Sequence, residues 1–349
     1  MSAIRTRHSP PSETAVRDPV SVKRSTESLR VEARLAVPST HDVEDSWELA
    51  ATVFVPVADA LPERPAVLVA IPGAGYSRHY FDIPEDTYSE AQYHTQRGTI
   101  VVALDHLGVG ESSVPPFEVT TLRVVARANN AAVKLILDDL RNGTLAPGIR
   151  PIDPACVVGA GQSMGGHILA GMQAYHRTFD GVAMLGSSMV CTSMPSRPGA
   201  AQVVVPEGTP PEEAAALLTQ ETDWRYAFFW EDVPESFVEA DFAGGHPLRE
   251  TAPIWGSTTV PGLAAALVLP GVVASEAASI DVPVLVGMGE RDVCQEPVAE
   301  LAAFTSATDI AAIVVPRMAH MHNFAGTRRR MWDRIDAFIV QVATLTTTS

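Results

Sequence analysis

The sequence predicts an α/β fold with a mostly parallel central sheet flanked by helices. Six short, nearly continuous apolar runs are typical of parallel strands that are buried on both faces. Helical stretches lie between most of these runs, which gives the alternating strand and helix order of an open parallel sheet. One run leads directly into Gly161-Gln162-Ser163-Met164-Gly165, where a strand would turn tightly into a helix. Together these observations predict one large α/β domain.

The predicted elements can be placed in order along the chain. Residues 29–37 and 47–56 are alternating or β-branched runs separated by a polar turn, so they predict an antiparallel pair that opens the domain. The apolar runs that predict parallel strands cover residues 65–71, 99–104, 155–159, 181–185, 282–288 and 310–315. The stretches that predict helices cover residues 87–97, 122–141, 164–176, 296–304 and 327–342.

The alternation of strands and helices breaks between residues 189 and 278. Proline-rich turns and a cluster of aromatic side chains replace it there. Short helices are predicted at residues 212–220, 224–230 and 261–269. The segment therefore predicts a mainly helical cap, or lid, inserted after the sixth strand and lying over the C-terminal edge of the sheet. Its aromatic side chains could equally form the cap's own core. The core domain would then comprise residues 29–188 and 279–349.

Composition and charge exclude several classes of protein. The 349 residues are 46% hydrophobic, which is enough for a large buried core. The formal net charge of -16 argues against nucleic acid as a partner, because a phosphate-binding surface needs clustered Lys and Arg. No apolar stretch approaches the roughly 18 uncharged residues that a membrane-spanning helix needs. We therefore expect no membrane anchor.

The N-terminal residues and the cysteines bear on the location of the protein. Residues 1–28 are rich in Ser, Pro and Arg and lack the apolar stretch of a secretory signal, so they predict a disordered tail. Cys156, Cys191 and Cys294 are widely separated and have no metal-ligand spacing, so they predict free thiols in a reducing compartment. The cytoplasm is the expected location. The oligomeric state stays open, a homo-oligomer included.

Ser163 is the candidate nucleophile. The glycines two residues before and after it allow a turn that is too tight for a side chain at those positions. The strained backbone of such a turn is costly to keep without a use. A Gly-x-Ser-x-Gly match alone is weak evidence, so the argument depends on the predicted strand before Ser163 and the predicted helix after it.

With its strands placed, the chain resembles the α/β-hydrolase superfamily from about residue 29 to the C-terminal helix, excluding the inserted segment. Besides the Ser163 turn, the resemblance rests on Ile71-Pro72-Gly73-Ala74-Gly75, on Asp105-His106-Leu107-Gly108-Val109-Gly110-Glu111-Ser112 and on two loops nearer the C-terminus. It implies an oxyanion hole made by the backbone N–H groups of Met164 and Ala74. Pro72 stands where the family often has His, which makes Gly75 a substitute donor. The Asp105 segment implies a structural turn.

The resemblance also implies a catalytic triad in the order Ser, acid, His. Asp292 lies where the family's acid follows a strand, and Glu290 is the alternative acid. His320 lies at the family's usual distance beyond the next strand, and His322 is the alternative base. A neutral imidazole can take the proton of Ser163 and return it to the leaving group, while the carboxylate fixes its tautomer.

The implied function is a serine hydrolase without cofactor or metal that cleaves an ester or a lactone through an acyl-enzyme. An aromatic, apolar cap favours a medium-sized hydrophobic small molecule as the substrate. The same triad could instead hydrolyse a C–C bond or transfer an acyl group to another alcohol. A non-catalytic binding protein on this fold is the third hypothesis. A metal site at His320 and His322 is not expected, because no further ligands follow at a recognisable spacing.

Overall fold

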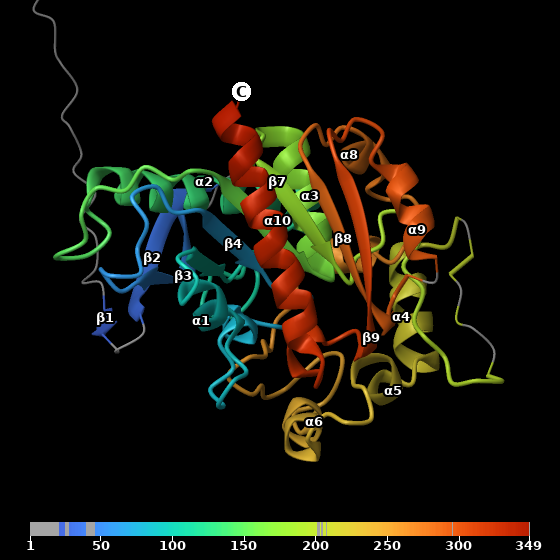
Figure 1. Cartoon of the computed structure of the whole chain (residues 1–349). Helices are drawn as coiled ribbons and strands as arrows, with labels where there is room; N and C mark the ends of the chain where they lie inside the picture. The colour runs from blue at the N-terminus through green and yellow to red at the C-terminus, as the bar shows by residue number, and fades with distance from the viewer. Residues whose placement is uncertain are drawn as a thin grey trace, which may run out of the picture.

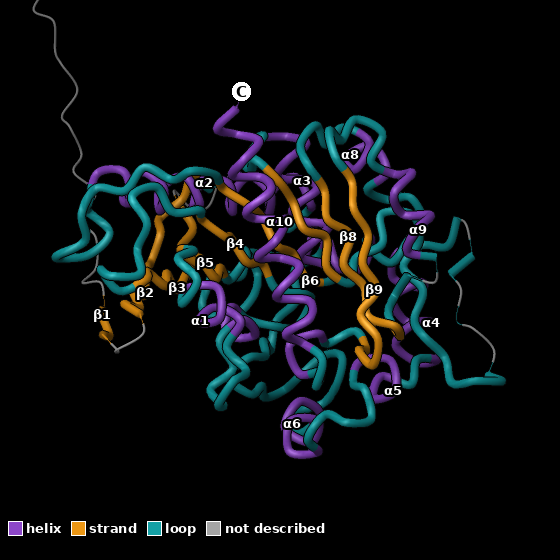
Figure 2. Tube along the Cα trace, viewed as in Figure 1, coloured by secondary structure: helices purple, strands orange, loops and turns teal. Residues whose placement is uncertain are grey.

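A computed structural model of the chain describes residues 21–24, 28–39, 46–200, 203, 205–206, 208–294 and 296–348. In this part of the chain a nine-stranded sheet runs through the molecule in the order β1-β2-β3-β5-β4-β6-β7-β8-β9 (Figures 1 and 2). The first three strands pair antiparallel, and β3 pairs antiparallel with β5. All pairs from β5 to β9 are parallel. The fold is therefore the mostly parallel α/β sheet that the sequence predicts.

The strands lie close to their predicted positions. They are β1 (Ser21–Arg24), β2 (Ser28–Pro38), β3 (Ser46–Pro56), β4 (Val67–Ile71), β5 (Ile100–Leu104), β6 (Val157–Gln162), β7 (Gly181–Leu185), β8 (Val284–Arg291) and β9 (Ile310–Ala319). β8 and β9 both run past their predicted ends, and their pairing continues to Arg291 opposite Ala319. This extension carries the residues that follow the two strands to the same edge of the sheet.

Residues 21–24 correct the prediction of a disordered tail over residues 1–28. They form β1, which pairs antiparallel with β2 from Ser21 opposite Glu32 to Arg24 opposite Leu29. The composition of the whole tail could not reveal a strand of four residues, and pairing on this edge satisfies backbone groups of β2. Because β1 precedes the first predicted strand, the sixth predicted strand is β7. Residues 1–20 lie outside the described residues.

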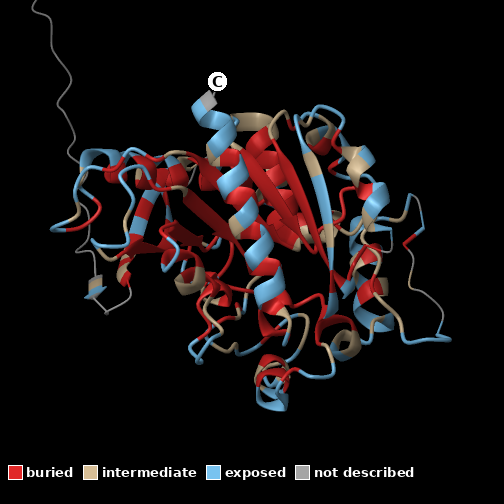
Figure 3. Cartoon of the chain, in the orientation of Figure 1, coloured by how far each residue is buried: buried red, intermediate tan, exposed pale blue. Residues whose placement is uncertain are grey.

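Helices cover both faces of the sheet (Figures 1 and 3). The core helices are α1 (Glu90–Thr95), α2 (Leu122–Asn142), α3 (Met164–His176), α9 (Pro297–Glu300) and α10 (Arg328–Thr348), with 3-10 turns at Arg78–Phe81, Phe117–Val119, Leu301–Ala303 and His322–Phe324. Alternate residues of β4 face opposite sides: Val67, Val69 and Ile71 join the apolar cluster under α2 and α3, and Leu68 and Ala70 join the cluster under α10. Each strand is thus buried on both faces.

The segment between β7 and β8 contains further short helices. They are α4 (Pro211–Glu221), α5 (Trp224–Phe228), α6 (Glu235–Phe242), α7 (Leu263–Ala266) and α8 (Ala274–Ala278). The predicted helices at 212–220, 224–230 and 261–269 correspond to α4, α5 and α7, whereas α6 and α8 were not predicted. We call residues 189–278 the inserted segment, and its role as a cap stays a prediction.

Two expectations about the whole chain can be compared with the structure. Cys156, Cys191 and Cys294 are free thiols, as predicted. Among the described helices, none combines the length and the apolar character needed to cross a membrane.

Candidate active site

Ser163 occupies the tight turn between β6 and α3. Its backbone has φ 54° and ψ -123°, a left-handed conformation that is strained for a residue with a side chain. A Cβ atom on Gly161 would lie 2.4 Å from the carbonyl carbon of Gly165, and one on Gly165 would lie 2.2 Å from the carbonyl oxygen of Ile71. Both positions therefore require glycine, as the sequence predicts for a nucleophile turn.

Three side chains from separate strand ends meet at this turn. The Oγ atom of Ser163 lies 3.0 Å from Nε2 of His320, and Nδ1 of His320 lies 2.7 Å from Oδ1 of Asp292. Asp292 follows β8 and His320 follows β9, and the parallel pairing of these strands brings both residues to one edge of the sheet. The structure thus brings together the three residues predicted as a triad.

The carboxylate of Asp292 is saturated with hydrogen bonds. Besides His320, its Oδ1 accepts from the backbone N–H of Val293 at 2.8 Å. Its Oδ2 accepts from the backbone N–H of Gly289 at 2.8 Å and lies 2.6 Å from Nε2 of His322. Burial alone would raise the pKa of this carboxyl group, but the adjacent imidazoles of His322 and His320 outweigh burial and hold the pKa well below its usual range. Asp292 therefore stays ionised.

The two alternative residues lie elsewhere. His322 contacts the far oxygen of Asp292 rather than Ser163, and its buried Nδ1 has no hydrogen-bond partner among the described residues. Glu290 is exposed at the surface, where its carboxylate accepts from the backbone N–H of Arg317 at 2.8 Å. The geometry thus favours His320 over His322 as the base and Asp292 over Glu290 as the acid.

The predicted oxyanion donors lie beside Ser163. Met164 is the first residue of α3, so its N–H has no acceptor within the helix and lies at the positive end of the helix dipole. The loop of Gly73 and Ala74 approaches closely, because a Cβ on Gly73 would lie 2.9 Å from Cβ of Ser163. Ala74 and Met164 both line the cavity described below. Gly75 has φ 74° and turns its carbonyl oxygen toward the inserted segment.

A buried ion pair that sequence reasoning missed holds this loop. Arg249 and Asp241, both in the inserted segment, have fully buried side chains and join through Nη2 and Oδ2 at 2.9 Å. Arg249 Nη1 also donates to the carbonyl oxygen of Gly75. Asp241 accepts from the Tyr76 hydroxyl at 2.7 Å and from Trp255 Nε1 at 2.9 Å. Because each charge is paired and hydrogen-bonded, the cluster ties the inserted segment to the loop of Gly73, Ala74 and Gly75.

The structural role expected for Asp105 is confirmed. Its buried carboxylate accepts from the backbone N–H groups of Arg78 at 2.5 Å and Glu111 at 2.9 Å, and it also pairs with the Arg78 guanidinium. A Cβ on Gly110 would lie 2.3 Å from this carboxylate, which explains the glycine there. Asp105 thus shapes the loop after β5.

Comparison with known proteins places the chain in a family. A model of the Alpha/beta hydrolase family matches residues 66–330, which is most of the chain. The chain belongs to the alpha/beta hydrolase family. A search of curated proteins by sequence found no match.

Solved structures of alpha/beta hydrolases share the fold at low sequence identity. An esterase from Thermogutta terrifontis has a TM-score of 0.57 and 18% identity, covering 89% of this hydrolase and 99% of that chain. A peroxisomal alpha-beta-hydrolase from Saccharomyces cerevisiae has a TM-score of 0.59 and 13% identity, covering 92% and 90%. An esterase from Exiguobacterium antarcticum has a TM-score of 0.58 and 18% identity, covering 87% and 98%. At such identities the likeness shows the fold alone.

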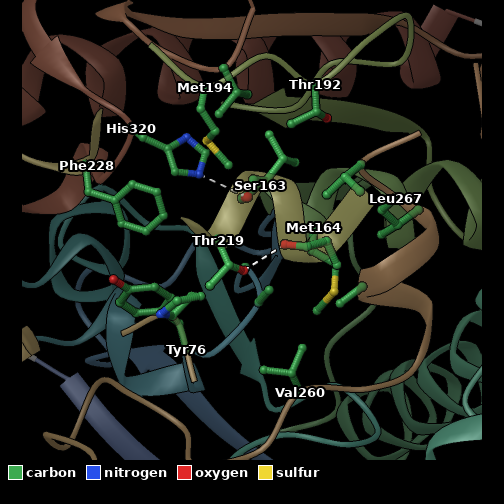
Figure 4. Close-up of a pocket in the computed structure, with 18 of the residues that line it drawn as sticks. Tyr76, Ser163, Met164, Thr192, Met194, Thr219, Phe228, Val260, Leu267 and His320 are labelled. Carbon is green, nitrogen blue, oxygen red and sulfur yellow. Dashed lines mark hydrogen bonds between the residues drawn. The ribbon is translucent and has the colours of Figure 1, made fainter. Parts of the chain in front are cut away.

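The site of this hydrolase opens into an apolar cavity of about 460 Å³ (Figure 4). Ser163 and His320 lie in its wall, and no Asp, Glu, Lys or Arg side chain is among its described lining residues. Burial lowers the pKa of His246 to about 3 and that of His167 to about 4, so both lining imidazoles are neutral at physiological pH. The cavity can therefore take a hydrophobic molecule, and its described lining residues offer no oppositely charged side chain to a charged group.

The described residues lack the ligand sets that metal ions require. Within them, no group of three or more His, Cys, Asp or Glu side chains is arranged as a metal site. His320 and His322, the pair considered from the sequence, each direct one ring nitrogen to Asp292.

Proposed function

We propose that this hydrolase is a serine esterase that cleaves an uncharged, medium-sized hydrophobic carboxylic ester or lactone. One observation carries the proposal: Ser163 Oγ lies 3.0 Å from His320 Nε2 in the wall of an apolar cavity without charged lining side chains. Ser163 is the nucleophile, His320 the general base and acid, and Asp292 the group that orients the imidazole.

The first half of the reaction forms an acyl-enzyme. His320 Nε2 takes the proton of Ser163 as Oγ attacks the ester carbonyl carbon. The backbone N–H groups of Met164 and Ala74 donate to the oxyanion that develops. The imidazolium then gives its proton to the alcohol oxygen as the bond between the carbonyl carbon and that oxygen breaks. The alcohol leaves and the acyl group stays on Ser163.

Water completes the cycle. His320 takes a proton from a water molecule that attacks the acyl carbon, and the returning proton restores the Ser163 hydroxyl as the acid leaves. Asp292 remains ionised throughout, because its four hydrogen-bonding partners and its low pKa favour the carboxylate. Its bond to Nδ1 keeps the lone pair of Nε2 directed at Ser163.

The inserted segment acts in this proposal as a cap over the site. It supplies lining residues from α4, α5 and the stretch around α7, among them Leu218, Trp224, Phe228 and Leu267. Apolar burial against these residues supports binding of a hydrophobic substrate. A carboxylate or ammonium in the substrate would be desolvated without an oppositely charged side chain among the described lining residues, which disfavours charged esters.

Hydrolysis of p-nitrophenyl esters of rising acyl length tests the proposal. We expect saturation kinetics with neutral medium-chain acyl groups and almost no turnover by Ser163→Ala. The monoester of adipic acid serves as the matched charged substrate, because its chain resembles that of the hexanoate but ends in a carboxylate. Turnover by Ser163→Ala equal to that of the wild type, or a preference for the charged ester, would contradict the proposal.

A further inference from the structure

The cavity has two walls of different chemistry. One wall is aromatic and contains Trp224, Phe228 and His246, whose ring centroids lie 5.0–5.1 Å apart pairwise. The other wall is mostly aliphatic and contains Val260, Ala264, Ala265, Leu267 and Val268, which come from the single stretch around α7. The lining residue Phe117 lies beside this stretch at Gly262 and is its one described aromatic neighbour in the lining. We call these the aromatic wall and the aliphatic wall. They are unlike enough to prefer different halves of a substrate.

The aromatic wall lies beside the base. The ring of Phe228 is centred 4.9 Å from the ring of His320, and the backbone N–H of His320 donates to the carbonyl oxygen of Ala227 at 3.2 Å. The end of α5 is therefore fixed against the His320 loop. Figure 4 shows Phe228 on the same side of Ser163 as His320.

The aliphatic wall lies beside the oxyanion donor. Met164 and Leu267 belong to one buried apolar cluster, and Ala264 packs against it. Phe228 belongs to the cluster on the other face of the sheet, against which Val268 at the end of the aliphatic wall also packs. Figure 4 shows Met164 and Leu267 across Ser163 from His320. Phe228 of the aromatic wall and Leu267 of the aliphatic wall thus lie on opposite sides of the nucleophile.

The reaction geometry assigns each wall to one half of an ester. In the tetrahedral intermediate the alcohol oxygen must lie within reach of the His320 imidazolium, because that group protonates it as it leaves. The acyl substituent extends away from His320, while the oxyanion occupies the donors of Met164 and Ala74. The alcohol half therefore meets the aromatic wall and the acyl half meets the aliphatic wall.

We propose that the substrate of this hydrolase is an ester of an aliphatic, medium-chain acid with an aromatic alcohol. The inference rests on the proposed esterase function and specifies which half of the ester is aromatic. Ring-to-ring contact with Phe228 and Trp224 favours an aromatic leaving group beyond its burial alone. The neutral state of His246 leaves the aromatic wall without charge. The reaction consumes one water and releases one aliphatic acid and one aromatic alcohol.

Two isomeric esters test the orientation. Benzyl hexanoate carries the ring on the alcohol, and its isomer pentyl phenylacetate carries the ring on the acid, so the two have the same composition and similar intrinsic reactivity. We expect kcat/KM to favour benzyl hexanoate by about tenfold, a ratio within reach of apolar pocket contacts. Equal values, or a preference for pentyl phenylacetate, would overturn the assignment of the walls.

A variant of the aromatic wall sharpens the test. Phe228→Leu keeps an apolar side chain but removes one ring of the aromatic wall and leaves Trp224 in place, so the preference for benzyl hexanoate over cyclohexylmethyl hexanoate should fall toward one. This ratio is measured within one variant, which cancels any general effect on His320. Phe229→Leu is the matched control, because Phe229 is buried next in the chain but does not line the cavity. An unchanged ratio in Phe228→Leu, or an equal loss in Phe229→Leu, would contradict the proposal.

Labelling and hydrolysis together distinguish an error in the assignment of the walls from an error in the proposed esterase function. Labelling of Ser163 by a fluorophosphonate and hydrolysis of both isomers, with the wrong preference, would overturn the assignment of the walls and leave the esterase standing. Absence of both labelling and hydrolysis in the folded protein would overturn the esterase and the inference together.

Discussion

The strand ends and the inserted segment contribute to the same cavity in different ways. Ser163, Asp292 and His320 follow β6, β8 and β9, and backbone hydrogen bonds of the parallel sheet set their positions. The inserted segment reaches the cavity through side chains from short helices and from loops. The first region offers reactive groups in one fixed geometry, while the second surrounds them with apolar surface. In the proposed esterase, the sheet would therefore determine the chemistry, and the inserted segment would determine which ester is cleaved.

Several hydrogen bonds join the two regions, and some of them involve a buried ion pair. The ion pair of Asp241 and Arg249 is fully buried and joins the inserted segment to the carbonyl oxygen of Gly75, next to Ala74, the proposed oxyanion donor. Separating a pair buried in this way costs several kcal/mol of free energy, on the order expected for a buried charge that loses its partner. This part of the inserted segment is therefore a fixed support of the loop that contains Gly73, Ala74 and Gly75.

Ser163→Ala should have the largest effect of any single substitution. It removes the attacking oxygen, and we expect kcat to fall by about 10⁴- to 10⁶-fold, as when a triad nucleophile is lost. Circular dichroism and the affinity for an apolar ligand should stay unchanged, because the cavity keeps its walls. Ser275→Ala, on the exposed surface of α8, is the control and should retain full activity.

Asp292→Asn tests the acid at the strand ends. The amide cannot hold His320 in the tautomer that accepts the Ser163 proton, so kcat should fall by about 10⁴-fold. Glu290→Gln changes the alternative acid in the same way and should leave the rate nearly unchanged. A larger loss in the Glu290 variant than in the Asp292 variant would refute the assignment.

Arg249→Met tests the coupling between the two regions. Asp241 would be left as a buried charge without its partner, which costs about 3–5 kcal/mol of unfolding free energy. Arg225→Met breaks the exposed pair with Glu235 and should cost at most about 1 kcal/mol. Urea denaturation measures both. Equal stability of the two variants would show that the buried pair does not hold the inserted segment in place.

The pH dependence of the unfolding free energy should distinguish His94, which lies in the core, from His246, which lines the cavity. His94, buried beside Asp336 and Glu90, would have a lower pKa from burial alone, but these two carboxylates raise the pKa to about 9. A raised folded-state pKa stabilises the fold fully below the unfolded value near 6.5 and loses that contribution as the pH rises to about 9.

The expected contribution of the His94 charge is on the order of 3 kcal/mol. Unfolding free energies measured between pH 6.5 and 9 should therefore fall in the wild type and stay flatter in His94→Gln. His246→Gln in the cavity should leave this slope unchanged, because the low pKa of His246 keeps it neutral over that range. Parallel slopes in the wild type and His94→Gln would contradict the account.

The sheet and the Ser163 turn could be predicted because their signals are local. Apolar runs gave the strands, the glycines around Ser163 gave the turn, and the predicted bounds of β7 and α3 agree with the structure. The support of the oxyanion loop could not be predicted in this way. Tyr76 and Asp241 are 165 residues apart, and nothing near Arg249 in the sequence indicates that its charge is buried.

The inserted segment was the least predictable region for the same reason. α6 and α8 are short, and tertiary contacts rather than a long apolar period stabilise them. The contact of His322 with Asp292 also could not be predicted from the sequence, because the spacing of His320 and His322 allowed either to be the base.

Fluorophosphonate labelling of the two histidine variants tests the central claim most directly. The rate of labelling reports the nucleophilicity of Ser163, and peptide mapping identifies the labelled residue. We predict that His320→Gln abolishes rapid labelling of Ser163, whereas His322→Gln retains it at a reduced rate. Rapid labelling in His320→Gln, together with its loss in His322→Gln, would contradict the assignment of His320 as the base.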